Sequence, residues 1–369
     1  MGSVEAGSQE FTGFNPEPLL DPKNVSRLSS EWNVPEEDIL LIALNASGIK
    51  YQNVVNDRGR FVVTLPDGRN YFLAVTISDK PLSPFEHKND QLYFGGASIA
   101  AVTPIQKDTC TDSYWRGSTK HLTLNSNSRS NCKGCSFCGT YSLDNDDDAL
   151  VNPNALRKKA SVLQEDLGHD LSSLKSVDVV TGCFPNEQSL VEHLLMVRDA
   201  FSEFGFAGEL GYIGSQLRSR DALEKVIASG PFVLHLTVEA FERRRQLMKT
   251  AKASLDLDLG RDVLELAKSM GAETSLLYIA GLDSHETMRE QFPLYVPMLT
   301  RLPQIQTFQA YVPEQIALRR PEAAGIEYFL QTRKIVEDTF PHLSPIAAKN
   351  YRSLWYTAYG EQVLPNAEI

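Results

Sequence analysis

Cysteine is scarce in this 369-residue sequence, and its five residues are unevenly placed. Cys132, Cys135 and Cys138 fall within seven positions, whereas Cys110 and Cys183 stand alone. A secreted disulfide framework spreads an even number of cysteines through a short chain. An odd count with one tight cluster instead indicates a reducing compartment and a metal site. The sequence therefore predicts a cytoplasmic protein with bound metal.

Long apolar runs are also missing, since no stretch reaches the roughly 18–20 residues that a membrane-spanning helix needs. Residues 1–14 are mostly polar, have no basic-then-apolar signal pattern, and are predicted to be disordered. Basic side chains are outnumbered, with 36 Lys and Arg against 47 Asp and Glu, for a formal net charge of −11. A nucleic-acid-binding face needs a basic patch. We therefore predict neither a membrane nor a nucleic acid as partner, and expect a small-molecule ligand.

Residues 15–110 mix one helical segment with β-rich runs. A helix is predicted over 35–47, because Pro35 suits a first turn and Gly48 stands where the helix would stop. The runs at 60–65 and 71–77 flank a Pro-Asp-Gly turn, which is typical of a β-hairpin. We predict a small α+β domain here.

From 111 to 337, strand-like runs alternate with amphipathic helical segments that end near glycines such as Gly205 and Gly271. Alternating β and α units favour a parallel sheet with right-handed crossovers. The predicted fold class is therefore α/β, a partial (β/α)6 TIM-like barrel, followed over 338–369 by a helical C-terminal extension. Ligands of such folds bind at the carboxyl ends of the strands. The strand candidates are 121–125, 176–181, 209–213, 232–237, 274–280 and 304–311.

The cysteine cluster closely follows the first of these strands, in the segment Cys132-Lys-Gly-Cys135-Ser-Phe-Cys138. Thiolates are soft ligands that suit iron–sulfur clusters or zinc. Three cysteines on a cubane cluster leave one iron open to a substrate or cofactor. A structural zinc site, which usually has four closed ligands, is an alternative with Cys110 or His121 as the fourth ligand. Plain buried cysteines are another alternative.

The triplet resembles the radical S-adenosylmethionine (SAM) signature Cys-x3-Cys-x2-Cys, with the aromatic Phe137 before the last cysteine. It departs from that pattern in the first gap, which holds two residues instead of three. The resemblance covers about residues 120–337. It implies a [4Fe–4S] cluster on Cys132, Cys135 and Cys138 that cleaves SAM to a 5′-deoxyadenosyl radical, which abstracts hydrogen from a small, possibly amino-acid-like substrate. It also implies an electron donor such as flavodoxin or ferredoxin.

Three further segments resemble SAM-binding motifs of the same family. Gly182 matches the first glycine of its Gly-Gly-Glu motif, with Cys183 in place of the second. Glu239 and Arg261 resemble the carboxylate and arginine that contact SAM in the biotin synthase and hydrogenase-maturase branch, and a guanidinium matches a carboxylate bidentately. The segment that carries Ile279 and Gly281 resembles the one that lies against the adenine.

Each segment has a plain structural alternative. The Gly182 segment reads equally as a strand-to-helix turn, Arg261 as a solvent-facing helix residue, and Asp283 with Ser284 as a helix cap. Cys183 is a candidate catalytic hydrogen-atom donor, because its S–H bond is weak, or a small buried side chain. Two other functions stay open: a non-catalytic iron–sulfur or zinc-binding protein, and an inactive barrel that acts as a partner subunit.

Overall fold

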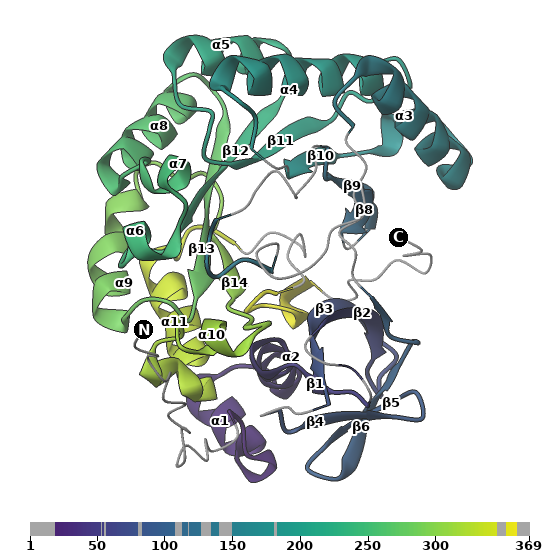
Figure 1. Ribbon diagram of the computed structural model, residues 1–369, viewed down its shortest axis with the longest axis vertical. Coiled ribbons are helices and arrows are strands. Elements are labelled where there is room, and N and C mark those ends of the chain that lie inside the picture. Colours follow the sequence, from purple (N-terminus) through teal and green to yellow (C-terminus); the bar gives the residue numbers. More distant parts are fainter. Residues whose placement is uncertain are drawn as a thin grey trace, which may run out of the picture.

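The computed structural model describes residues 19–52, 54, 57–79, 83–107, 113–116, 118–126, 134–139, 150–180, 183–344 and 352–359. Within them the chain forms two β-sheets of seven strands each. The first sheet ends at Lys107 and the second begins at Ser113. The helices lie mainly on the outer side of the second sheet (Figure 1).

The N-terminal sheet curls into a closed barrel of six strands. Its strand order is β3-β1-β4-β5-β6-β2-β7, and a further β2–β3 pairing closes the ring. Most pairings are antiparallel, but β1 runs parallel to both β3 and β4, so the barrel is mixed. The elements are α1 (Val25–Trp32), α2 (Glu36–Ser47), β1 (Ile49–Lys50), β2 (Asp57–Thr64), β3 (Asn70–Ser78), β4 (Phe85–Lys88), β5 (Gln91–Phe94), β6 (Ala97–Val102) and β7 (Gln106–Lys107).

The second sheet is an open half-barrel with the strand order β14-β13-β12-β11-β10-β9-β8. Strands β9 to β14 are parallel, whereas the edge strand β8 is antiparallel to β9. The strands are β8 (Ser113–Arg116), β9 (Ser118–Leu124), β10 (Ser176–Val180), β11 (Glu209–Gly214), β12 (Phe232–Glu239), β13 (Glu273–Ala280) and β14 (Gln304–Thr307).

Helices between these strands cover the convex face of the half-barrel (Figure 1). Several begin at a side chain that accepts a backbone N–H bond, as Asn186 does for α4 and Asp256 for α8, and such caps each contribute about 1 kcal/mol. The helices are α3 (Pro153–Leu167), α4 (Glu187–Ser202), α5 (Arg220–Ala228), α6 (Arg244–Leu247), α7 (Thr250–Ala253), α8 (Leu257–Ser269), α9 (His285–Gln291), α10 (Pro313–Ile316) and α11 (Ile326–Thr339).

The predicted fold class, a partial (β/α)6 TIM-like barrel behind a small α+β domain, is wrong. The structure instead combines a closed six-stranded mixed β-barrel with an open parallel half-barrel sheet. The predicted helix over 35–47 and the hairpin around Pro66 are confirmed as α2 and the β2–β3 pair. Strands β4 to β6 have four to six residues each and went unrecognised. These short strands close the barrel, so its closure could not be inferred from one hairpin.

The predicted helical extension over 338–369 is also wrong for the described residues. Helix α11 ends at Thr339, and beyond it the described part holds only one short 3-10 turn, Thr357–Tyr359. Arg333 on α11 links this tail to the N-terminal part of the chain. It donates to Asp38 on α2 at 2.6 Å and to the Leu354 carbonyl at 2.8 Å. In the described part of the chain, no helix combines the length and apolarity needed to cross a bilayer.

Candidate functional site

The carboxyl ends of the parallel strands share one edge of the half-barrel, and a turn containing two cysteines packs there. The Cys138 N–H donates to the Cys135 carbonyl at 3.1 Å, so both thiols belong to a single turn. The Ser136 N–H donates to the Leu247 carbonyl at 2.9 Å. Gln315 Nε2 donates to the carbonyls of Ser136 at 2.9 Å and Cys138 at 3.3 Å. The backbone of the turn therefore bonds to two other segments of the chain.

This turn belongs to a second apolar cluster, separate from the main core. Cys135 and Phe137 are buried there against Ile213 at the end of β11, and against Leu277 and Ile279 on β13. Ile279, which the sequence predicts at the SAM adenine, thus shares a cluster with a predicted metal ligand. The sheet's concave face carries the cysteine turn.

Burial raises the pKa of the Cys135 thiol, although the Lys252 ammonium and the Lys249 backbone N–H act in the opposite direction. A thiol in such surroundings is protonated and unreactive until a cation binds it. Among the described residues, Cys135, Cys138 and Cys183 form no disulfide.

The prediction of a metal-binding group is wrong for the described residues. No set of three or more His, Cys, Asp or Glu side chains in this part of the chain is arranged to hold a metal ion. Two of the three predicted ligands, Cys135 and Cys138, lie in one turn, whereas Cys132 lies outside the described residues, as does Gly182. Among the described residues, the structure therefore brings together two thiols of the predicted set, Cys135 and Cys138.

Glu239, the last residue of β12, has an unusual backbone. Its φ of 68° is left-handed, and the β12–β13 register shifts between Thr237 and Glu239. A non-glycine residue in this conformation costs about 1–3 kcal/mol and persists only where its neighbours enforce it. The buried Glu239 carboxylate accepts a hydrogen bond from Lys252 Nζ on α7. Strain and a buried ion pair thus coincide at the end of a strand.

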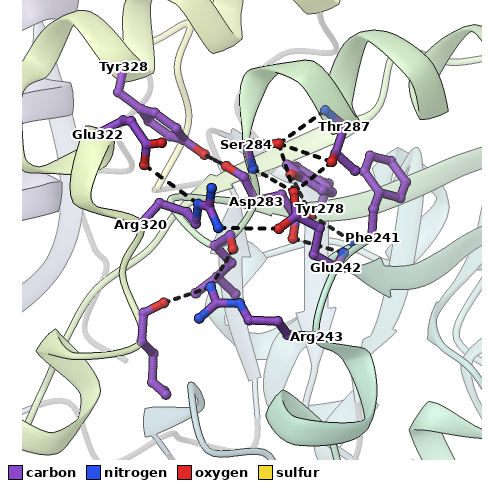
Figure 2. A network of polar contacts seen from close by, with 12 residues as sticks. Phe241, Glu242, Arg243, Tyr278, Asp283, Ser284, Thr287, Arg320, Glu322 and Tyr328 are labelled. Atoms are coloured by element: carbon purple, nitrogen blue, oxygen red, sulfur yellow. Dashed lines mark hydrogen bonds and ion pairs between the residues drawn. The ribbon is translucent and has the colours of Figure 1, made fainter.

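A network of polar contacts holds the loop that follows Glu239 (Figure 2). The Asp283 carboxylate accepts from the backbone N–H groups of Phe241 at 2.6 Å and Glu242 at 3.0 Å, and from the Tyr278 hydroxyl at 2.8 Å. Burial raises the pKa of Asp283 even though these bonds oppose the shift. Asp283 therefore ties the loop after β12 to the loop after β13.

Glu242 extends this network toward α9. It accepts from the Ser284 N–H at 3.0 Å and the Thr287 hydroxyl at 2.6 Å, and Arg320 lies 3.5 Å away. Burial opposes ionisation, but these hydrogen bonds outweigh it and lower the pKa of Glu242. Ser284 Oγ also accepts from the Thr287 N–H and so caps α9, which confirms the helix-cap alternative for this residue.

The described contacts of Arg261 are with Asp258 and Tyr295, and Glu239 is not among them. The Arg261 guanidinium forms an ion pair with Asp258 on the same helix, α8, and lies over the Tyr295 ring at 5.8 Å. The cation that contacts Glu239 is Lys252. Sequence reasoning missed Lys252 because the helix α7 that carries it has only four residues.

A second lysine links the cysteine turn to Cys183. Lys249 Nζ donates to Cys183 Sγ at 2.7 Å. Gly134 has a φ of +113°, and a Cβ placed there would lie 3.0 Å from the Lys249 Cβ. Only a glycine lets the cysteine turn approach this lysine so closely. Lys249 therefore contacts both Cys183 and the turn that holds Cys135.

Backbone conformation and packing explain why residue 281 is a glycine. Its φ is +120°, and a Cβ there would lie 2.9 Å from the Phe308 Cβ. Its N–H donates to the Tyr328 hydroxyl at 3.2 Å, and its carbonyl accepts from the Arg320 N–H at 2.9 Å. Close packing thus accounts for this glycine without an adenine.

No protein-family model matches this chain, and no curated protein matches it either.

Proposed function

We propose that this chain is a radical SAM enzyme acting on a small-molecule substrate. One observation carries the proposal: the turn of Cys135 and Cys138 packs at the carboxyl ends of parallel strands, beside Glu239 and Ile279. Ligand sites of parallel α/β sheets lie at that edge. Three sets of residues that the family resemblance picked out far apart in sequence therefore meet in one place.

The donors present fit an iron–sulfur cluster in kind. Cys135 and Cys138 would hold the [4Fe–4S] cluster together with Cys132, and thiolates are the usual ligands of such clusters. When bound, the cluster supplies the electron that cleaves SAM into methionine and a 5′-deoxyadenosyl radical. An external donor such as flavodoxin or ferredoxin would supply that electron.

The remaining work falls to the protein. Lys252, in place of Arg261, would pair with the SAM carboxylate, and Glu239 holds the Lys252 ammonium in place through their ion pair. The apolar cluster around Phe137 and Ile279 excludes water from the site. Water exclusion and positioning are the contributions that a protein makes to cofactor chemistry.

The test is anaerobic reconstitution of the full chain with iron and sulfide, followed by reduction in the presence of SAM. We expect a brown protein that releases 5′-deoxyadenosine. Cys138→Ala should lose most of the iron and the cleavage activity. Cys183→Ala is the matched control, because it removes a nearby thiol outside the signature and should keep the iron. A colourless zinc protein, or equal iron content in both variants, would contradict the proposal.

A further inference from the structure

One loop contacts both the N-terminal barrel and the cysteine turn. It follows strand β14, spans residues 308–320 and includes α10, and we call it the β14 loop. Strand β14 lies beside α2, the helix that leads into the N-terminal barrel (Figure 1). The hydrogen bonds of this loop form a continuous path from the barrel to the backbone of Cys138.

The N-terminal part of the chain holds the start of the β14 loop. Gln309 is 2% exposed, and its Nε2 donates to the Ala74 carbonyl of β3 at 2.9 Å and to Asn45 Oδ1 of α2 at 3.1 Å. Thr76 Oγ1, also on β3, donates to the Ala310 carbonyl at 3.2 Å. Buried polar groups rarely go without partners, so these bonds fix where residues 309 and 310 can lie.

Tyr311 continues the path toward the cysteine turn. Its hydroxyl donates to Gln309 Oε1 at 2.5 Å, and its ring is buried. A Cβ placed on Gly139, the residue after Cys138, would lie 3.1 Å from that ring. The end of the cysteine turn therefore packs directly against Tyr311.

Gln315 joins the backbone of the β14 loop to that of the cysteine turn. Its side chain is in a residue only 2% exposed. Oε1 accepts from the Tyr311 N–H at 2.8 Å, while Nε2 donates to the carbonyls of Ser136 and Cys138. An amide has both an acceptor and two donors, and all three bonds use them in their proper roles.

These bonds restrict the position of the Cys138 sulfur. The two carbonyls that Gln315 holds precede and follow the Phe137–Cys138 pair along the chain, and Phe137 is buried. A cysteine sulfur is separated from the backbone by a single rotatable bond with a few staggered positions. Fixing the backbone therefore largely fixes the sulfur. Groups that bind a metal or substrate must be held within about 0.5 Å by their surroundings.

We propose that Gln315 is a positioning residue that holds the Cys138 thiol for metal binding, and that the N-terminal barrel fixes Gln315 by holding residues 309–311. The inference rests on the proposed function in that the metal is its iron–sulfur cluster. It gives the N-terminal barrel a role in the site, although the barrel contributes no predicted ligand.

The first test uses the full-length protein without metal. N-ethylmaleimide alkylates the thiols, and peptide mass spectrometry follows Cys138 and Cys183 separately. Both residues are partly exposed, so the ratio of their rates separates a loosened turn from general unfolding. Gln315→Met keeps the length of the side chain but removes its three hydrogen bonds. It should raise the rate at Cys138 about tenfold relative to Cys183, because the turn opens more often.

Gln246→Met is the matched control for this substitution. Gln246 is exposed on α6, and the neighbouring Leu247 carbonyl accepts from the Ser136 N–H. The control should leave the ratio of rates as in the parent. An unchanged ratio in Gln315→Met, or an equal rise at Cys138 and Cys183, would overturn the proposal.

The second test changes the barrel alone. Thr76→Val keeps the shape of the side chain but loses the bond to the Ala310 carbonyl, and should raise the same ratio about threefold. Thr64→Val is its control, because it also removes one hydroxyl bond from the barrel, to Asn70, away from the β14 loop. Equal ratios in the two threonine variants would reject the part of the proposal that concerns the barrel.

Reconstitution with iron and sulfide separates this proposal from the proposed function. In iron-loaded Gln315→Met, the electron paramagnetic resonance spectrum of the reduced cluster should differ from that of the parent, whereas Gln246→Met should match the parent. SAM cleavage by the parent with an unchanged alkylation ratio in Gln315→Met would reject the positioning role alone. A raised ratio in a protein that never binds iron would reject the radical reaction and leave Gln315 as the residue that holds the thiol.

Discussion

Acidification should destabilise this protein through one buried histidine. His193 on α4 is buried, and its Nε2 lies 2.7 Å from the Ser126 Oγ, just beyond the end of β9. Its ring lies 4.9 Å from that of Phe184, the residue after Cys183. The histidine thus supports two strand ends that lead to the candidate site.

Burial lowers the pKa of His193 to about 4. In the unfolded chain a histidine titrates near 6.5. Between pH 4 and pH 6.5 His193 is protonated in the unfolded chain but neutral in the folded protein, so the free energy of unfolding rises with pH. The contribution of His193 is therefore complete above about pH 6.5 and is lost as the pH falls toward 4. With a pKa of about 4 in the folded protein and about 6.5 in the unfolded chain, the loss between pH 7 and pH 4 is about 3 kcal/mol.

The assay is urea unfolding of the parent and of His193→Phe at pH 7 and pH 4. His193→Phe keeps an aromatic ring against Phe184 but loses one neutral hydrogen bond. That loss should lower the free energy of unfolding by about 1 kcal/mol at pH 7. From pH 7 to pH 4 the free energy of unfolding should fall in both proteins. The fall in His193→Phe should be smaller than that in the parent by about 3 kcal/mol. The exposed His342 provides a control, since His342→Gln should respond to pH as the parent does. Equal losses in the parent and His193→Phe would refute the reasoning.

Three further predictions concern the strand ends. Gly281→Ala adds a Cβ at a left-handed φ and against a neighbouring side chain, and should cost about 2–4 kcal/mol in denaturant unfolding. Lys252→Met should weaken SAM binding at least tenfold in equilibrium dialysis, while Arg261→Met leaves it unchanged; the reverse order would reject our assignment. Asp283→Asn should cost about 2–3 kcal/mol, because it removes one acceptor from a set of buried donors, whereas Asp338→Asn on the exposed face of α11 should cost under about 0.5 kcal/mol.

The strands of the half-barrel were predictable from sequence because each has a strong local signal. Every one of the six strand candidates matches a parallel strand from β9 to β14, within a few residues. The N-terminal barrel was not predictable, since β1 and β7 have two residues each and its closure depends on pairing between distant segments. Local patterns report which segments are extended, but they do not report which strands meet.

The site was predictable where a motif fixes a residue's place along the chain. Cys135 and Cys138 were located from their spacing, and Glu239 from its position at a strand end. Arg261 was chosen by resemblance alone, and its side chain turns toward Asp258 instead. A residue on a helix several turns long can face in any direction, and its spacing from a strand does not set that direction.

One signal in the sequence went unused. Strands covered on both faces usually read as continuous apolar runs. Here β9 reads Leu122-Thr-Leu124, β10 reads Val177-Asp-Val179, and β12 reads Leu234-His-Leu-Thr237. This alternation indicates that one face of the sheet packs against helices while the other meets polar contents. The apolar residues pack the half-barrel against its helices, and the polar ones lie on the opposite face of the sheet. The polar and apolar faces of the half-barrel can therefore be told apart from these alternating strands, and Cys135 packs with Ile213 and Ile279 on the face away from the helices.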